Sequence, residues 1–228
     1  MNQADQALID DLNYLSRTGH EIDLLNVHKG IPVLYKTTLK KYADDRATVS
    51  FGDQFAAICL LLERRTTLLS DRLVAPVNAT AFSVDLPTGT ATLNRFRYAA
   101  RTGDRMILRA EPAEEIPVVV ETGQGRVAGT VVDLSMSGVG LIVPPDKAAA
   151  VRIHGVVRLK FTLDSTPLDL SGPVRYLKPQ ADACRVGVNL VQTPEARLIF
   201  EYVHRRQDEI LRELETLYRS TVESKTAC

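Results

Sequence analysis

The sequence has few of the residues that build metal centres and disulfide frameworks. It contains no tryptophan, and only 6% of its 228 residues are aromatic. Its three cysteines are far apart and form no Cys-x-x-Cys motif, which fits a reducing cytoplasm. Its four histidines show no ligand spacing, either among themselves or with the cysteines. We therefore expect no metal site.

Long apolar runs and an excess of one charge are also lacking. No apolar run reaches the roughly 18 residues that a spanning helix needs. The N-terminus has no basic region followed by an apolar core, so we expect no secretion signal and a cytoplasmic protein. Lys plus Arg equals Asp plus Glu, at 28 each, which argues against a general nucleic-acid binder. Such a balance still permits a local cluster of arginines.

The first hundred residues have the pattern of a small β-barrel. Leucines at helical spacing predict a short N-terminal helix over residues 3–16. Short runs of β-forming composition follow, separated by turn residues such as the pair Asp44-Asp45. Five or six strands at this spacing are typical of a small barrel, so we assign residues 1–100 to a first domain. The runs are 31–36, 47–51, 56–62, 66–69, 77–86 and 90–98.

The rest of the chain predicts a second barrel followed by a helix. Residues 101–115 are charged and carry little strand pattern, so they are the expected interdomain linker. Strand patterns then begin at Ile116, and a long apolar stripe predicts a C-terminal helix. We assign 101–220 to this second domain and 221–228 to a tail. The helix is longer than one small barrel needs, and its excess either packs within the protein or docks a partner or a second copy.

Two apolar runs flank a turn that reads Asp133-Leu-Ser135-Met-Ser-Gly138. Val and Ile in the flanking runs favour strands. Asp, Ser and Gly favour the turn, the first two by local hydrogen bonds and glycine by tolerating a positive φ. One interpretation is a hairpin in which Asp133 and Ser135 only cap the turn. The other is a binding turn that presents a carboxylate, a hydroxyl and backbone N–H groups at one point.

Arginines at intervals of four stand upstream of this turn, at Arg97, Arg101, Arg105 and Arg109. An Arg-x-x-x-Arg pair shortly before Asp-x-Ser-x-x-Gly, on a barrel-like pattern, resembles the PilZ domain family, which binds the bacterial second messenger cyclic di-GMP. The resemblance covers about residues 101–220. A β-rich module in front of it is similar to the YcgR-like flagellar-brake arrangement.

The resemblance implies a mainly β protein with two small barrels in tandem. The first would be split-barrel-like, and the second would be a six-stranded PilZ barrel with a longer C-terminal helix. It also implies a cyclic di-GMP site formed by Arg105, Arg109, Asp133, Ser135 and Gly138. The arginines suit phosphate and the O6/N7 edge of guanine, and the carboxylate suits a Watson–Crick edge. Gly138 would let the turn approach the ligand and adopt a φ that other residues resist.

Several alternatives remain open at the level of sequence. Arg101 with Arg105 fits the arginine pattern as well as Arg105 with Arg109. Asp104 stands where many family members carry an additional arginine, which favours a protein-interaction scaffold with a degenerate site as the second hypothesis. A flavin-using first barrel is a third, although residues 20–100 hold no phosphate-binding glycine loop or catalytic set. We do not expect an enzyme.

The expected output is regulation through a protein partner. Ligand binding would change the orientation of the two domains and so control motility, biofilm formation or secretion. By resemblance, the partner would belong to the flagellar motor, a pilus or a secretion apparatus, with recruitment to the flagellar basal body. The sequence leaves open a monomer or a homodimer, and one or two ligands per site.

Overall fold

The computed structural model describes residues 3–99, 108–191 and 194–226. The chain divides into two compact units, residues 1–107 with 210–228 and residues 108–209. From the sequence we predict the boundary near residue 100 and assign the whole C-terminal helix to the second domain. Those boundaries stay a prediction.

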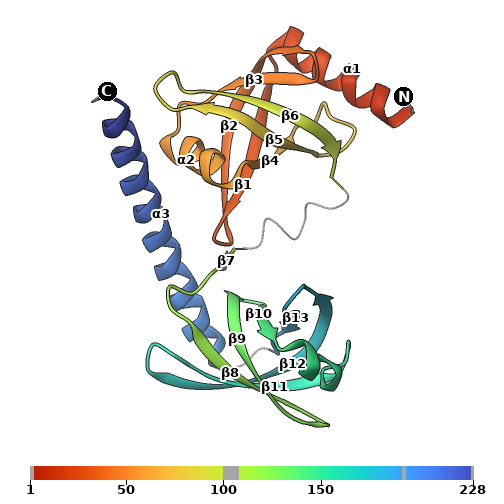
Figure 1. Cartoon of the computed structure of the whole chain (residues 1–228), viewed down its shortest axis with the longest axis vertical. Coiled ribbons are helices and arrows are strands. Elements are labelled where there is room, and N and C mark those ends of the chain that lie inside the picture. The colour runs from red at the N-terminus through yellow and green to blue at the C-terminus, as the bar shows by residue number, and fades with distance from the viewer. Residues whose placement is uncertain (1–2, 100–107, 192–193, 227–228) are drawn as a thin grey trace. The chain divides into compact units, whose positions relative to one another are not determined.

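The first unit contains a closed six-stranded barrel (Figure 1). Its strands follow one another around the barrel in the order β1-β2-β3-β6-β5-β4, and each neighbouring pair is antiparallel. The strands are β1 (Glu21–His28), β2 (Ile31–Ala43), β3 (Arg46–Ser50), β4 (Arg65–Leu69), β5 (Val77–Asp85) and β6 (Thr90–Tyr98).

Local turn chemistry accounts for the connection between β2 and β3. Asp44 and Asp45 join β2 to β3 with φ values of 53° and 55°. Two successive positive φ values match the twist of an antiparallel hairpin, and aspartate tolerates them better than most residues. The sequence did not lead us to β1, in which alternate burial is interrupted by three consecutive buried residues.

The N-terminal helix α1 (Gln3–Thr18) forms as predicted. Its Leu12 and Leu15 side chains are fully buried in the core of the first unit. Helical spacing puts both on one face, so burial of that face stabilises the helix in its place.

The prediction of a strand over residues 56–62 is wrong, because this segment is the helix α2 (Gln54–Glu63). A short, fully apolar run gives no periodicity that separates a buried strand from a buried helix. The N-cap residue, Asp53, favours the helix. Asp53 accepts hydrogen bonds from the backbone N–H groups of Phe55 and Ala56, at 2.7 and 3.0 Å, and so satisfies two donors that the first turn leaves unpaired.

The second unit is also a closed six-stranded barrel. Its order is β10-β13-β12-β11-β8-β9, closed by pairing of β9 with β10, and the two-residue strand β7 adds to β9. The tandem-barrel fold class predicted from the sequence is confirmed. The strands are β7 (Arg109–Ala110), β8 (Ile116–Thr122), β9 (Gly125–Ser135), β10 (Gly138–Val143), β11 (Val156–Leu163), β12 (Thr166–Pro179) and β13 (Cys184–Asn189), with the 3₁₀ helix η2 (Pro145–Ala150) after β10.

The C-terminal helix α3 (Ala196–Thr226) contributes residues to both units. Ile199 and Val203 are buried in the part that belongs to the second unit. In the part that belongs to the first unit, Ile210 is buried and Tyr218 packs against the core. Part of the helix beyond the second barrel therefore packs against the first unit, while Leu217 stays exposed, and the docking of a partner or a second copy stays a prediction.

Gly172 on β12 gives a test of the second barrel. A Cβ there would lie 1.6 Å from the backbone oxygen of Asn189, so we expect Gly172→Ala to destabilise this barrel by at least about 2 kcal/mol. Gly123, in an exposed turn with no atom within 4 Å of the Cβ position, is the control, and Gly123→Ala should be close to neutral. Calorimetric unfolding measures both, and equal effects would contradict the register between β12 and β13.

Candidate functional site

A β-bulge in β9 sets the direction of the Asp133 side chain. Asp133 pairs with Gly140 of β10, whereas Leu141 pairs with Val131, so Val132 is an extra residue without a partner. An extra residue shifts the alternation of a strand. Val131 and Leu134 accordingly both enter the core, at 3% and 0% exposure. Asp133 is thereby turned to the outer side of the barrel.

The Asp133 carboxylate is held by two guanidinium groups. Arg109 Nη1 donates to Oδ1 at 3.2 Å, and Arg185 Nη2 donates to Oδ2 at 2.5 Å. The carboxylate side chain is only 4% exposed, while the two arginines are 33% and 39% exposed. An ionised carboxylate with so little access to water needs such partners, because burial without them costs several kcal/mol.

The two arginines come from different sides of the β9–β10 hairpin. Arg109 is on β7, which pairs with the end of β9. Arg185 is on β13, the strand on the far side of β10. Gly140 lies between Asp133 and Gly187 in the register, so no side chain of β10 separates the carboxylate from β13 at this level.

Gly140 is the residue that makes room for the carboxylate. A Cβ at this position would lie 2.2 Å from Asp133 Oδ2 and 2.6 Å from its Cγ. The requirement is for space, since the backbone of Gly140 has no positive φ. The sequence contained enough to find this residue, because a two-residue turn that pairs Ser135 with Gly138 necessarily pairs Asp133 with Gly140.

Sequence reasoning also missed Arg185, which stands 52 residues from Asp133 in the chain. Burial lowers the pKa of the Arg185 guanidinium, but interactions with Asp133, and to a smaller extent with Tyr176, outweigh it, and the net pKa shift is upward. The Nε of Arg185 is buried and has no hydrogen-bond partner. One donor of this fork is therefore left without an acceptor in the described part of the protein.

Ser135 and Gly138 have local roles in the hairpin. Ser135 is fully buried, and its hydroxyl donates to the backbone oxygen of Gly138 at 3.1 Å. The turn-capping interpretation is thus correct for Ser135, whereas Asp133 bonds to arginines. The expectation of an unusual φ at Gly138 is wrong, because that φ is not positive. Glycine is needed there since a Cβ would lie 2.8 Å from the Val188 backbone oxygen.

The structure brings four of the five predicted site residues together around the β9–β10 turn. Arg109 pairs with Ser135 in the register and bonds to Asp133, and Gly138 closes the turn. The fifth, Arg105, lies outside the described residues, as does Arg101. The choice between the two arginine registers, and the ligand roles of all five residues, stay predictions.

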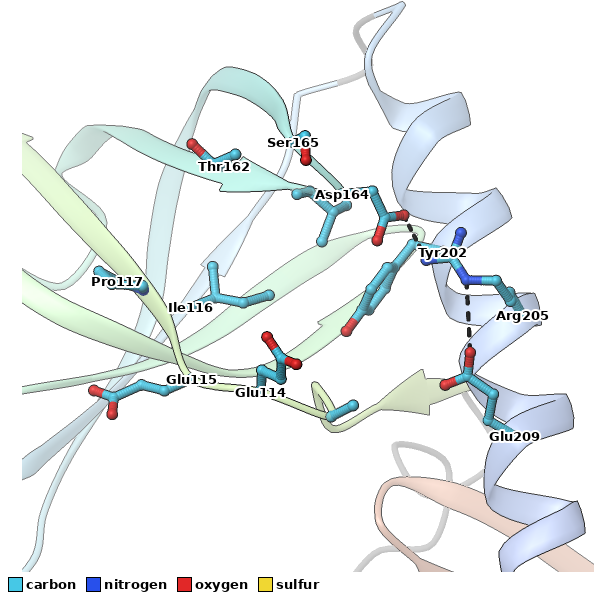
Figure 2. A pocket seen from close by; sticks show the side chains of 12 residues that line it. Glu114, Glu115, Ile116, Pro117, Thr162, Asp164, Ser165, Tyr202, Arg205 and Glu209 are labelled. Atoms are coloured by element: carbon cyan, nitrogen blue, oxygen red, sulfur yellow. Dashed lines mark hydrogen bonds and ion pairs between the residues drawn. The ribbon is translucent and has the colours of Figure 1, made fainter.

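A separate pocket of about 480 Å³ in the second unit is a poor site for an anion (Figure 2). Arg205 of α3 points towards the turn between β11 and β12, where it bonds to Asp164, whereas the Tyr202 ring points towards the segment around Glu114. Glu209 also lies 3.7 Å from Arg205, and Glu114 lines the same pocket. Acidic groups thus compensate the one arginine.

Two further kinds of feature are not found in the described part of the chain. No group of three or more His, Cys, Asp or Glu side chains there is placed to hold a metal ion. Its helices include none with both the length and the apolar character needed to cross a membrane.

Comparisons with known proteins find one family match, which covers most of the second unit. The model of the PilZ domain matches residues 100–205. No curated protein sequence matches the chain.

Solved structures show a distant similarity. The crystal structure of YcgR in complex with c-di-GMP from Escherichia coli is 12% identical, with 94% of this chain and 96% of that chain covered and a TM-score of 0.47. The Bacillus subtilis inhibitor of motility (MotI/DgrA) is 10% identical, with 84% and 97% covered and a TM-score of 0.40. The K. pneumonia MrkH–c-di-GMP complex is 12% identical, with 96% and 97% covered and a TM-score of 0.41.

The contact between Gly140 and Asp133 can be tested by a double-mutant cycle. We expect Gly140→Ala to displace the carboxylate from its two arginines and to destabilise the second barrel by about 1–3 kcal/mol. In an Asp133→Ala background the clash is absent, so most of that cost should disappear. Urea unfolding of the four proteins measures the coupling. Additive effects would show that Asp133 does not occupy the space above Gly140.

Proposed function

We propose that the protein is a cyclic di-GMP effector, because residues 100–205 match the model of the PilZ domain. The observation that carries the proposal is the Asp133 carboxylate, held between Arg109 and Arg185 beside the Asp-x-Ser-x-x-Gly turn. The proposed ligand residues are Arg105, Arg109, Asp133, Ser135 and Gly138, with Arg185 added from the geometry.

The chemistry of this group matches the ligand. Cyclic di-GMP has two phosphates and two guanines. A guanine offers O6 and N7 acceptors on one edge, which suit the arginine fork, and N1–H and N2–H donors on another, which suit a carboxylate. Arg109 and Arg185 together exceed the charge of Asp133 by one positive charge, and Arg105 would bring the excess to two. That excess equals the charge of the two phosphates.

Binding would require an exchange of hydrogen-bond partners. Both oxygens of Asp133 already accept from arginines. Arg109 is the partner more able to leave, because it lies on a strand of two residues and bonds at 3.2 Å. Arg185 lies on a strand that is paired on both sides, so its backbone is held more firmly. We propose that Arg109 turns to the ligand while Arg185 retains the carboxylate, whose oxygens each have two acceptor sites.

The proposed output follows from the position of Arg105 in the sequence. It stands in the segment that joins the two barrels, so a ligand held by both Arg105 and Asp133 would favour one orientation of the barrels over others. Through a protein partner this change would regulate motility, biofilm formation or secretion. The proposed place of action is the cytoplasm, with recruitment to the flagellar basal body where the partner is the motor.

A second candidate function is a PilZ-fold interaction scaffold that binds no nucleotide. The occupied state of both Asp133 oxygens favours it, as does Asp104 next to Arg105 in the sequence. Calorimetric titration of the purified protein with cyclic di-GMP separates the two candidates, because only the effector gives saturable heat. It also gives the number of ligands per chain.

We expect Asp133→Ala and Arg109→Ala each to weaken cyclic di-GMP binding at least about 30-fold. Each removes one member of a charge-assisted set, a loss of about 2 kcal/mol or more. Titration calorimetry measures the affinity. Arg158→Ala is the matched control, because Arg158 bonds to Asp169 on an exposed face of the same barrel, and its affinity should equal that of the wild type.

Unaltered affinity in both Asp133→Ala and Arg109→Ala would refute the site. Circular dichroism of each variant shows whether the fold is retained. Equal losses in the Arg158→Ala control would assign the effect to general electrostatics.

Arg185 is expected to act as a positioning residue. We expect Arg185→Gln to weaken cyclic di-GMP binding about tenfold, because the carboxylate loses the partner that holds it while Arg109 is exchanged. The effect should be much smaller in an Asp133→Ala background. An equal loss in both backgrounds would mean that Arg185 acts independently of Asp133.

A further inference from the structure

A second group of arginines lies in the first unit, on a surface formed by three neighbouring strands. A pocket of about 600 Å³ there is lined by residues of β4, β5 and β6, among them Arg65, Arg95 and Arg97. In the register, Arg65 pairs with Thr80 and Arg97 pairs with Asn78. The arginines of β4 and β6 therefore flank the polar side chains of β5. All lining residues belong to the first unit.

A β-bulge in β6 shapes this pocket. Asn78 pairs with Arg97 and Thr80 pairs with Asn94, so β6 has one more residue than β5 between these two pairs. Arg95 lies in the bulge and has a φ of 56°. Few residues other than glycine and asparagine adopt such a φ, and bulges commonly redirect a side chain next to a binding site.

Among the residues that the structure describes, the three arginines have no partner of opposite charge. None of them makes an ion pair or a side-chain hydrogen bond within the described part of the chain. The arginines of the second unit differ, since many of them are paired with acids, as Arg109, Arg158 and Arg205 are. Three like charges around one pocket repel one another, and an anion between them would remove that repulsion.

The remaining polar groups of the pocket leave its charge uncompensated. The Tyr98 hydroxyl donates to Asp11 at 3.0 Å, so this donor is directed to an acid that does not line the pocket. The Thr66 hydroxyl donates to Asn26 at 3.0 Å. No Asp or Glu is among the described residues that line the pocket, although the chain as a whole has zero net charge.

We propose that this pocket binds the phosphate group of a small molecule. Guanidinium forks match phosphate oxygens two at a time, and the volume falls within the range of small-molecule sites, about 300–1,000 Å³. The ligand is either a free phosphorylated molecule or a further molecule of cyclic di-GMP. Both present the same chemistry to the three arginines. The site is independent of Asp133.

The test is titration calorimetry on the full chain, with inorganic pyrophosphate and with cyclic di-GMP as separate probes. We expect the wild type to bind pyrophosphate at one site at low salt. Arg97→Gln should weaken that binding about tenfold or more. Arg17→Gln is the matched control, because it removes the same charge from an exposed position on α1, and it should change the affinity less than about twofold.

A second substitution in the same pocket keeps the test valid if Arg97→Gln fails to fold. Arg95→Asn keeps a residue that tolerates the positive φ, and it should weaken pyrophosphate binding as Arg97→Gln does. Pyrophosphate binding that depends on Arg97 is measured without cyclic di-GMP, so failure of the proposed cyclic di-GMP site is distinguished from failure of this one.

The outcomes separate the two ligand sources. Loss of one of two cyclic di-GMP equivalents in Arg97→Gln identifies a further second-messenger molecule as the ligand. Pyrophosphate binding that depends on Arg97, without such a loss, identifies a free phosphorylated molecule. The proposal is overturned if neither probe gives saturable binding that depends on Arg97, or if Arg17→Gln weakens binding as much as Arg97→Gln.

Discussion

A carboxylate with almost no access to water is the constraint around which the second barrel is built. Asp133 has an exposed fraction of 3%, and an ionised group at that depth is stable only when its charge is compensated. Arg109 and Arg185 supply that compensation, and Gly140 supplies the space. The bulge in β9 and the glycine at position 140 of β10 therefore both accommodate the buried carboxylate of Asp133.

The sequence was informative wherever the determining interactions are local. The β9–β10 hairpin follows from its own turn residues, and α1 follows from the spacing of its leucines. The run 56–62 was misassigned because an apolar segment carries no periodic information, and the deciding contact is the side chain of Asp53 before it. Arg185 was beyond reach, since its role depends on the pairing of β10 with β13, which no local pattern specifies.

Net charge is a poor guide to where charge is available. The chain is neutral overall, yet its two units distribute arginines differently. In the second unit Arg158 and Arg205 are each matched by an acid on a neighbouring element. In the first unit Arg65 and Arg97 line one pocket, and the described residues of that pocket include no acid. Acids elsewhere bring the net charge of the chain to zero. They do not compensate the arginines of that pocket, because screening in water limits the range over which exposed charges interact.

The internal ion pair at Asp133 also bears on how tightly a ligand can bind. A ligand that displaces Arg109 must first break the Arg109–Asp133 contact, so its apparent affinity falls by the fraction of molecules in which that contact is open. Arg109 is one-third exposed, so water can solvate its guanidinium when the contact opens, and Arg185 still compensates the buried carboxylate. The contact thus holds the empty site in order at a cost in affinity, while the bond to Arg185 keeps the carboxylate in place.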